Sequence, residues 1–415
     1  MLGSWEGNKV YKRGSKALSS RVDHMYTDRL VCVRCGSSFE AQEEIWACKD
    51  CGSLLDVKYN YEEIQKRFEK DDLLKRMSCL WRYKELLPIK QIGNICSLGE
   101  GWTYVQKSSN YGDMLGLEKL FLKLEYLNPT GSFKDRGSTV LVSKAKELGV
   151  RSMIDDSSGN AGSSLAAYCA KGGIEACIYV PASAPAEKVT QVKIYGAKLV
   201  RIDGTMEDLA KAAQDACRIE GKYYGSHRIN PYFLEGTKTF AYEVAEQMGW
   251  VVPDHVVFPV GGGSLIVGSW KGFCELQKLG WIEKSPKLHC VQAEACMPIV
   301  HAYLRGSDYI QEVEESETVA GGVRIRRPAR GEQVLDAVRE TGGAALAVSD
   351  KELLHHQKAL ARREGIFAEP TSCVALAGLA ELCKNKEIDH DETVVVPITG
   401  FGLKDVETAK KQVGL

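Results

Sequence analysis

The segment Asn128-Pro-Thr-Gly-Ser-Phe-Lys-Asp-Arg-Gly137 places one lysine, Lys134, between a predicted strand and a predicted helix. The apolar pattern predicts the strand at Lys119–Tyr126 and, with a period near 3.6, the helix at Gly137–Leu148. Ser132 is placed to cap this helix, so the positive end of the helix dipole would lie beside the lysine. A lysine there is disfavoured as an ammonium and is easier to hold as a neutral amine or an imine. A solvated lysine in the first turn of a helix is the alternative that this segment alone leaves open.

Strands and helices alternate regularly around and beyond this lysine. The first series comprises strands at Ser152–Asp155, Glu175–Val180 and Lys198–Ile202 and helices at Ala161–Lys171 and Ala186–Tyr195. The second series follows a helix at Gly236–Met248 and comprises strands at His255–Pro259, His289–Ala293 and Thr393–Ile398 and helices at Leu265–Leu279, Asp350–Glu364 and Ser372–Cys383. Such alternation predicts parallel sheets with helices on their faces, here an α/β protein of two doubly wound domains. Open parallel sheets bind ligands at the carboxyl ends of their strands.

Three further segments directly follow predicted strands. Asp155-Asp-Ser-Ser-Gly-Asn-Ala-Gly162 either binds an anion such as a carboxylate through N–H groups and hydroxyls, or forms a capping turn before a close-packed helix. Phe258-Pro-Val-Gly-Gly-Gly-Ser-Leu-Ile-Val-Gly268 has three consecutive glycines at a helix N-terminus, so its backbone can approach a phosphate. Its spacing is not that of a dinucleotide or nucleotide-triphosphate loop. Val394-Val-Val-Pro-Ile-Thr-Gly-Phe-Gly-Leu-Lys-Asp405 is a buried strand that ends at a hydroxyl, or an ordinary exit from strand to turn.

More motifs lie along the same stretch of chain. They are Asn230-Pro-Tyr-x-Leu-Glu-Gly-Thr-Lys-Thr239, Val291-Gln-Ala-Glu294, Ala320-Gly-Gly-Val-Arg-Ile325, Glu364-Gly-Ile-Phe-Ala-Glu-Pro-Thr-Ser372 and Thr399-Gly-Phe-Gly-Leu-Lys404. With the lysine segment, they resemble the tryptophan-synthase-β-like (fold type II) pyridoxal-phosphate enzymes, and within them the threonine synthases. The resemblance covers about residues 80–405. So many collinear motifs are very specific for this superfamily and less specific for one reaction.

The resemblance implies a role for each motif. Lys134 would carry pyridoxal 5'-phosphate as a Schiff base and later move the Cα proton of the substrate, Asn160 would hydrogen-bond the ring oxygen of the cofactor, and Thr399 would meet its pyridine nitrogen. Because a hydroxyl does not enforce protonation of that nitrogen, the ring would favour elimination and replacement over transamination. The phosphate of the cofactor would lie against Gly261, Gly262, Gly263, Ser264 and Leu265. The carboxylate of the substrate would be held by Ser157, Ser158, Gly159 and Ala161.

The chain departs from the threonine-synthase pattern near the substrate. Threonine synthases usually read Asn-Ser-x-Asn-Pro-x-Arg where this chain reads His227-Arg-Ile-Asn-Pro-Tyr-Phe233, so phenylalanine stands where an arginine is expected to grip the phosphate of the substrate. Arg228 is the candidate to replace that arginine, from a different direction on the chain. The glycine loop looks more like that of serine/threonine dehydratases. We therefore expect threonine-synthase-like elimination or replacement on a small amino acid. A dehydratase-like ammonia-lyase, or a β-replacement synthase whose substrate lacks the phosphate of O-phosphohomoserine, stays open.

Four of the 14 cysteines form two pairs, Cys32-x-x-Cys35 and Cys48-x-x-Cys51, each followed by glycine and separated by twelve residues. This spacing is typical of a zinc ribbon, in which two tight turns place four thiolates around one Zn²⁺; four free thiols are the alternative. The ligand set has no histidine or carboxylate that would leave a position open, so a structural zinc is expected. Many zinc ribbons bind nucleic acid, but this module has more acidic than basic side chains and should repel phosphates.

The whole chain has 415 residues, a formal net charge of −1 and 26% charged residues. This length and composition suit a globular protein of two or three domains, and the charge gives no basic excess for nucleic acid or an anionic membrane. Apolar runs shorter than a membrane helix and the lack of a secretory signal predict a cytoplasmic protein. A small amino-acid substrate and a homodimer are expected from the resemblance. The predicted division is an arm at 1–29, the ribbon at 30–60, a large cofactor-binding domain at 61–118 and 221–415, and a smaller, mobile α/β domain at 119–220.

Overall fold

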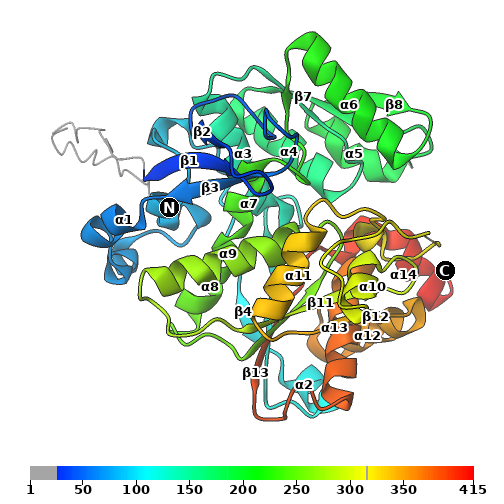
Figure 1. Cartoon of the computed structure of the whole chain (residues 1–415). Coiled ribbons are helices and arrows are strands. Elements are labelled where there is room, and N and C mark those ends of the chain that lie inside the picture. The colour runs from blue at the N-terminus through cyan, green and yellow to red at the C-terminus, as the bar shows by residue number, and fades with distance from the viewer. Residues whose placement is uncertain (1–25, 185, 315) are drawn as a thin grey trace, which may run out of the picture.

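The computed structural model describes residues 26–184, 186–314 and 316–415. The strands form a six-stranded sheet in the order β12-β11-β10-β13-β5-β4, a four-stranded sheet in the order β8-β7-β6-β9, and a small sheet in the order β2-β1-β3. Figure 1 shows the four-stranded sheet with its helices in the upper part of the molecule and the six-stranded sheet in the lower part. These two sheets confirm the predicted α/β fold.

The larger sheet is parallel except for its edge strand β4, which runs antiparallel to β5. Its strands are β4 (Val105–Lys107), β5 (Lys119–Lys123), β10 (His255–Pro259), β11 (Lys287–Ala293), β12 (Ala345–Val348) and β13 (Thr393–Pro397). The associated helices are α2 (Ser109–Leu115), α8 (Thr239–Gln247), α9 (Ser264–Lys278), α10 (Pro298–Leu304), α11 (Gly331–Glu340), α12 (Asp350–Glu364), α13 (Pro370–Lys384) and α14 (Val406–Val413). The central strands β10 and β13 are buried on both faces, which explains their continuous apolar sequences.

The smaller sheet is parallel throughout. Its strands are β6 (Ser152–Asp155), β7 (Glu175–Pro181), β8 (Lys198–Ile202) and β9 (Tyr223–Tyr224). Its helices are α3 (Lys134–Glu147), α4 (Asn160–Gly172), α5 (Ala186–Ile194) and α6 (Met206–Glu220), and α7 (Pro231–Thr237) leads from β9 back to the larger sheet. The carboxyl ends of β6 and β9 therefore lie next to each other, and both lead into segments that the sequence marks as functional.

Four elements match the sequence prediction residue for residue: β6, β8, β10 and α12. Helix α12 shows why, because Ser349 and Glu352 form a capping box at its start and Gly365 adopts a left-handed conformation at its end. The sequence analysis did not predict α6, α11 or β12. It also merged α7 and α8, which are separate helices, into one helix from Gly236.

Two strands belong to the other sheet than the domain boundaries predicted at residues 119 and 220 would assign them. Strand β5 pairs with β13 in the larger sheet, and β9 pairs with β6 in the smaller one. These pairings favour a smaller unit that begins after β5 and extends to β9, while the division into domains stays a proposal. The predicted arm at 1–29 lies mostly outside the described residues, and Thr27–Arg29 belong to strand β1.

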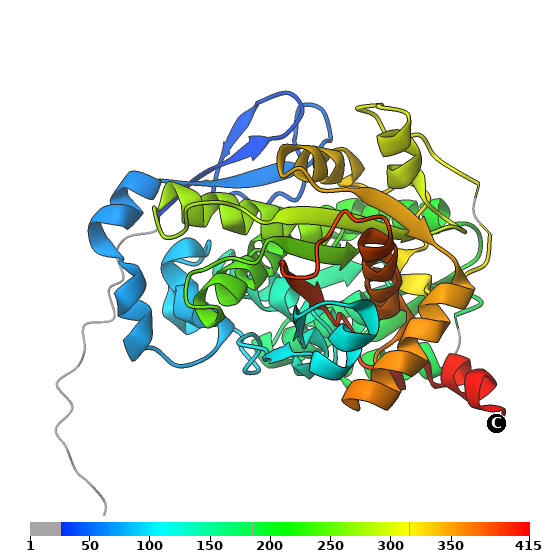
Figure 2. The same ribbon diagram turned by 90° about the horizontal axis from the view of Figure 1, so that it is seen from below.

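The cysteine module is built on β1 (Thr27–Cys32), β2 (Ser38–Glu40) and β3 (Leu55–Tyr59), followed by α1 (Tyr61–Arg67). It packs on α7 and β9: the Tyr232 hydroxyl donates to the carbonyl of Ala41 at 3.1 Å, and the Trp46 ring meets the Tyr223 ring edge-on at 5.8 Å. Figure 2 shows this module in blue at the opposite side of the molecule from the C-terminal helix in red. Among the described residues, no helix combines the length and apolar character needed to cross a membrane.

Candidate active site

Lys134 is the first residue of α3, so the helix begins earlier than the predicted Gly137. Ser132 does not cap it: the N-cap residue is Phe133, and the buried Ser132 hydroxyl makes no hydrogen bond with the described residues. Instead, the Asp135 carboxylate accepts hydrogen bonds from the backbone N–H and the hydroxyl of Thr130, each at 2.6 Å. A carboxylate from the first helical turn thus fixes the loop that leads to the lysine.

Two glycines let α3 and α7 pack in direct contact beneath Lys134. A Cβ on Gly236 would lie 1.8 Å from the carbonyl oxygen of Arg136, and a Cβ on Gly137 would lie 2.5 Å from the Phe233 ring. Neither position can accept a side chain unless its neighbour moves. The Phe233 ring is buried by this contact, and its centroid is 5.9 Å from Lys134 Nζ. Phe233 therefore provides apolar packing under the lysine at the position where a phosphate-binding arginine was expected.

The amine of Lys134 lacks a close counter-charge. Its Nζ lies 4.4 Å from the centroid of the Phe133 ring, and no carboxylate of the described residues reaches ion-pair distance. Burial lowers the pKa of Lys134 to about 8, against the more distant carboxylates of Asp155 and Glu369, which raise it. A lysine in this state supplies a larger fraction of neutral amine at physiological pH than an ordinary lysine, as a Schiff-base lysine or a general base requires.

We expect the cofactor-free protein to be acylated at Lys134 with a pH midpoint near 8, below the ordinary lysine value of 10.5. Burial disfavours the ammonium, so the reactive neutral amine is present above pH 8 and is lost as pH falls below it. The measurement is labelling by an acid anhydride followed by mass spectrometry, with exposed lysines of the same sample as the internal reference. Asp155→Asn removes a charge that raises this pKa and should move the midpoint lower. A midpoint unchanged from that of exposed lysines would contradict the assignment.

Asp155 and His227 face Lys134 from the ends of β6 and β9. The Asp155 carboxylate is 1% exposed and lies 3.7 Å from His227 Nδ1. Neither Asp155 oxygen nor His227 Nδ1 makes a well-formed hydrogen bond within the described residues. Burial raises the pKa of Asp155 to about 6, while burial and the charge of Lys134 hold the pKa of His227 well below its ordinary value. The lysine thus has two neighbouring polar groups with unused hydrogen-bonding capacity.

Asp156 and Arg228 form the adjacent pair and neutralise each other. The Asp156 carboxylate accepts a hydrogen bond from the Ser226 hydroxyl at 2.9 Å and another from the Arg228 guanidinium. Only 22% of the Arg228 side chain is exposed, and the Asp156 side chain is fully buried. The proposed role of Arg228 in binding the phosphate of a substrate therefore competes with an existing ion pair.

Asn160 and Thr399 converge on one carboxylate, that of Glu369. The Asn160 amide donates to Glu369 Oε2 at 3.0 Å, and the Thr399 hydroxyl lies 3.4 Å from Glu369 Oε1 and 2.9 Å from the Ser372 hydroxyl. Burial raises the pKa of Glu369 against these hydrogen bonds and the charges of Lys404 and Lys134. The sequence analysis quoted the motif that contains Glu369 and gave this residue no role. A signal was present, because a glutamate directly before the proline that opens a buried helix lies at the helix N-terminus.

The glycine loop joins β10 to α9. Gly263 is the N-cap residue of α9 with φ +91°, a left-handed conformation that glycine adopts without strain. Space around Gly262 is open, since a Cβ there would meet no atom within 4 Å. The Thr237 hydroxyl donates to the carbonyl of Ser264 at 2.9 Å and Leu265 is buried, so α7, which holds Phe233 under the lysine, also fixes this loop. The N-terminus of this 15-residue helix can therefore bind an anion.

The loop before α4 places the proposed substrate-binding residues at a second helix N-terminus. Gly159 is the N-cap residue, its N–H contacts the Ser157 hydroxyl at 3.3 Å, and Ser158 is half-buried. Ala161 lies in the first turn and is buried. Backbone N–H groups at the start of α4 can bind a carboxylate. Lys134, this loop, the glycine loop and the Asn160–Thr399 pair together fit a cofactor with an aldehyde, a polar ring and a phosphate.

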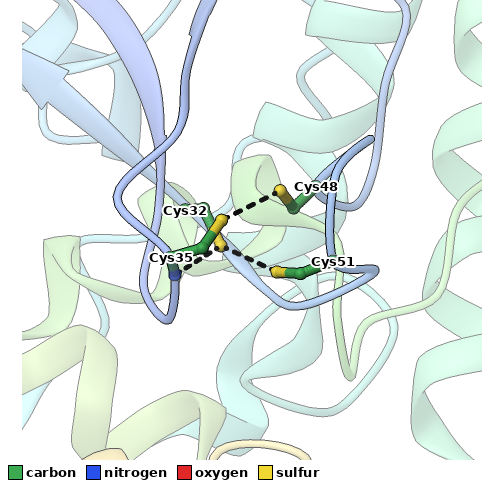
Figure 3. Close-up of side chains that lie close together, drawn as sticks. All are labelled: Cys32, Cys35, Cys48 and Cys51. Carbon is green, nitrogen blue, oxygen red and sulfur yellow. Dashed lines mark hydrogen bonds between the residues drawn. The ribbon is translucent and has the colours of Figure 1, made fainter.

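The four paired cysteines meet at one point, as Figure 3 shows. Their sulfur atoms all lie within 4.8 Å of one another, with Cys32 and Cys51 3.5 Å apart and Cys35 and Cys48 3.6 Å apart. The backbone N–H of Cys35 donates to the Cys32 sulfur at 3.4 Å. Zn–S bonds of about 2.3 Å in a tetrahedron separate sulfurs by about 3.8 Å, so the group is the right size to hold a metal ion.

Comparison with known proteins places the chain among its relatives. The family described as "Pyridoxal-phosphate dependent enzyme" matches residues 96–400. A threonine synthase of Methanocaldococcus jannaschii is 41% identical over 379 residues, which are 91% of this chain and 93% of that protein. A threonine synthase of Methanosarcina acetivorans is 42% identical over 380 residues, again 91% and 93%. Among solved structures, a threonine deaminase of T.th. superposes with a TM-score of 0.61 at 27% identity, covering 72% of this chain and 92% of that one.

The fold and the lysine site thus define a pyridoxal-phosphate-dependent enzyme, and the chain belongs to that family. The threonine synthases among its relatives define its subgroup within this family. It is a threonine-synthase-like enzyme of amino-acid metabolism, as the resemblance in the sequence implied.

Proposed function

We propose that the site catalyses elimination or replacement on a small amino acid, with Lys134 as both the attachment point of the cofactor and the base. The observation that carries this proposal is a lysine with a pKa of about 8 that lacks a close counter-charge. Bound pyridoxal phosphate supplies electron withdrawal from the Cα of the substrate. Lys134, as a neutral amine, takes the proton from that carbon and returns it later. Asp155 and His227 offer polar atoms without hydrogen-bond partners among the described residues, on the side of Lys134 where β6 and β9 end.

The remaining residues of the site are proposed to hold and orient the cofactor and the substrate. Asn160 and Thr399 would bind the polar edges of the cofactor ring, and their shared contact with Glu369 fixes their side chains beforehand. Gly261, Gly262, Gly263, Ser264 and Leu265, at the N-terminus of α9, would hold the phosphate of the cofactor. The carboxylate of the substrate lies at the N-terminus of α4, on Ser157, Ser158, Gly159 and Ala161. Both anions are thereby neutralised by backbone N–H groups and helix dipoles.

The leaving group of the substrate distinguishes the candidate reactions. A dianionic phosphate on the substrate calls for a free cation, which the threonine-synthase pattern would supply from the position of Phe233. In this chain, Phe233 packs on Gly137 and Arg228 is paired with Asp156. These contacts favour the second candidate, a dehydratase-like ammonia-lyase or a β-replacement synthase whose substrate needs no such grip.

A product assay on the cofactor-loaded protein tests the proposal. O-phosphohomoserine, O-phosphoserine, serine and threonine are offered separately, and phosphate, ammonia, 2-oxo acid and new amino acids are measured. Phosphate plus threonine from O-phosphohomoserine identifies a threonine synthase. Oxo acid and ammonia from serine or threonine, with O-phosphohomoserine untouched, identifies the ammonia-lyase. Turnover of none of the four, also with added thiols as nucleophiles, contradicts the proposal.

The four-cysteine site is proposed to hold one structural Zn²⁺ per chain. Cys35 is exposed, so Cys35→Ser would change the free energy of unfolding by only about 0.5 kcal/mol if the residue were an ordinary surface thiol. With a bound zinc, the same change should remove the metal and cost more than about 3 kcal/mol. Metal content by mass spectrometry and chemical denaturation measure both effects. Cys79→Ser, outside the cluster, should keep the zinc; full stability of the Cys35→Ser variant would argue against a structural metal.

The surroundings proposed for the enzyme are a homodimer in the cytoplasm, acting on a small amino acid without a nucleic-acid or membrane partner. Light scattering coupled to size-exclusion chromatography tests the dimer directly.

A further inference from the structure

Arg330 lies against the glycine loop although the sequence motifs give it no role. It is the N-cap residue of α11, and it is 1% exposed. A Cβ on Gly263 would lie 3.3 Å from the Cβ of Arg330. The far end of the side chain reaches the segment after β9, where its Nη2 lies 3.5 Å from the carbonyl oxygen of Ile229. The stem of the Arg330 side chain is therefore packed against the glycine loop, and its guanidinium lies at the segment that brings His227 to Lys134.

The charge of Arg330 is not compensated by an ion pair with any described residue. Its Nη1 donates to the neutral Gln333 amide at 3.1 Å, and its buried Nε makes no hydrogen bond within the described part of the chain. The carboxylates that influence it, Asp56 and Glu235, are both ion-paired with Lys271. Burial lowers the pKa of Arg330 to about 10, against these two carboxylates, so the side chain is still a cation at neutral pH.

Arg136, which is also fully buried, shows how a buried guanidinium is stabilised by ion pairs. Arg136 is 0% exposed and makes ion pairs with Glu125 at 2.6 Å and Glu243 at 2.7 Å. A buried guanidinium without such partners is costly, and proteins keep one where an anionic ligand completes it. A planar fork of N–H donors matches the oxygen atoms of a phosphate.

We propose that Arg330 and the loop Gly261–Ser264 together bind a phosphate monoester, with the guanidinium as its cationic contact. The inference rests on the proposed assignment of the glycine loop as a phosphate site. Two sources share this chemistry: the phosphate of the cofactor and the phosphate of a phosphorylated amino-acid substrate. The position against Gly263 matches the first source, and the contact with Ile229 lies on the side of the second.

The test compares wild-type protein with Arg330→Gln in equilibrium binding of two cofactor forms. Pyridoxal phosphate and pyridoxal differ only in the phosphate, so their dissociation constants isolate the contribution of that group. We expect Arg330→Gln to weaken binding of pyridoxal phosphate by about 10- to 100-fold and to leave pyridoxal unchanged. Arg327→Gln is the matched control, because Arg327 is exposed in the same segment and should have no effect.

A second arm separates the source of the phosphate. If binding of pyridoxal phosphate is unchanged, the loaded variants are titrated with O-phosphoserine and serine and followed by visible absorbance. A selective loss for O-phosphoserine assigns Arg330 to the substrate. Equal losses of affinity for phosphorylated and unphosphorylated ligands, or no loss for any ligand, would overturn the proposal.

Arg330→Lys is the control for a folding defect, because it keeps the charge. This variant should retain part of the discrimination between pyridoxal phosphate and pyridoxal. If Arg330→Gln loses affinity only for phosphorylated ligands while the cofactor still attaches to Lys134, the phosphate site is supported whether or not the proposed reaction is correct.

Discussion

Replacing Lys134 with alanine should remove the visible absorbance of the cofactor bound through this residue and lower kcat by at least about 1,000-fold. Both effects have one cause, since the same amine attaches the cofactor and moves the proton at Cα. Other lysines near the site or in the core already have partners: Lys404, whose charge also acts on Glu369, donates to the Gln191 side chain at 2.7 Å. The most deeply buried ones, Lys123, Lys144 and Lys238, are ion-paired with Glu243, Glu147 and Glu235 at 2.8, 2.8 and 2.5 Å.

The matched control for this prediction is Lys146→Ala. Lys146 belongs to the same helix, is exposed, and should be replaceable with absorbance and turnover intact. Far-ultraviolet circular dichroism of both variants checks that α3 is preserved. Retention of the chromophore and of turnover in Lys134→Ala would mean that another residue binds the cofactor, and the central assignment would fail.

Local sequence was sufficient to place Lys134. The segment before it contains a proline and a glycine, and the helix after it has a clear apolar period. Neighbouring residues are therefore enough to predict the junction between loop and helix. The same holds for α12, with its capping box at Ser349. Helix α6 was missed although its signal is local: Thr205 and Asp208 form a capping box, and the buried residues Leu209, Ala213 and Cys217 recur every four positions.

Contacts across long stretches of chain could not be predicted in this way. Glu369 meets Asn160 from 209 residues away, and Arg330 reaches Ile229 from 101 residues away. The apolar periodicity of the sequence contains no information on such long-range contacts. The placement of β5 in the larger sheet is of the same kind, because its partner β13 begins at Thr393. Periodicity identifies a strand, whereas its neighbour in the sheet depends on the whole topology.

The departures from the threonine-synthase pattern are explained by contacts between the carboxyl ends of β6 and β9. His227 and Arg228 replace the expected asparagine and serine, and they meet Asp155 and Asp156 at the end of the adjacent strand. Two basic residues thus face two acidic ones on neighbouring parallel strands. Since Arg228 is neutralised by Asp156 and Phe233 is packed under α3, any anion of the substrate depends on other groups. For this reason we propose Arg330, which packs against the glycine loop, as the cation for a phosphate.

Replacing Arg136 with leucine should destabilise the fold by about 3–5 kcal/mol, because it leaves buried carboxylates without their cation. The guanidinium donates to Glu125 and Glu243, and the side chains of all three residues are 0% exposed. Burial raises the pKa of Glu243, but the charges of Arg136 and Lys123 outweigh burial and hold it at about 2. Since this pKa is below the ordinary value, the ionised network stabilises the protein at neutral pH, and that stability is lost as pH falls through the folded-state pKa.

Urea unfolding of Arg136→Leu at neutral pH measures the loss, and Arg218→Leu provides the matched control. Arg218 also lies on a helix and is paired with an aspartate, Asp215, at 3.0 Å, but 66% of its side chain is exposed. An exposed pair contributes only about 0–1 kcal/mol, so this variant should unfold almost as the wild type does. Equal effects of the two substitutions would show that burial does not amplify the charge interaction. The predicted difference also matters for catalysis, because Arg136 lies two residues after Lys134 and fixes the first turn of α3. A destabilised variant that still folds should therefore bind the cofactor more weakly, although Arg136 is in the protein interior.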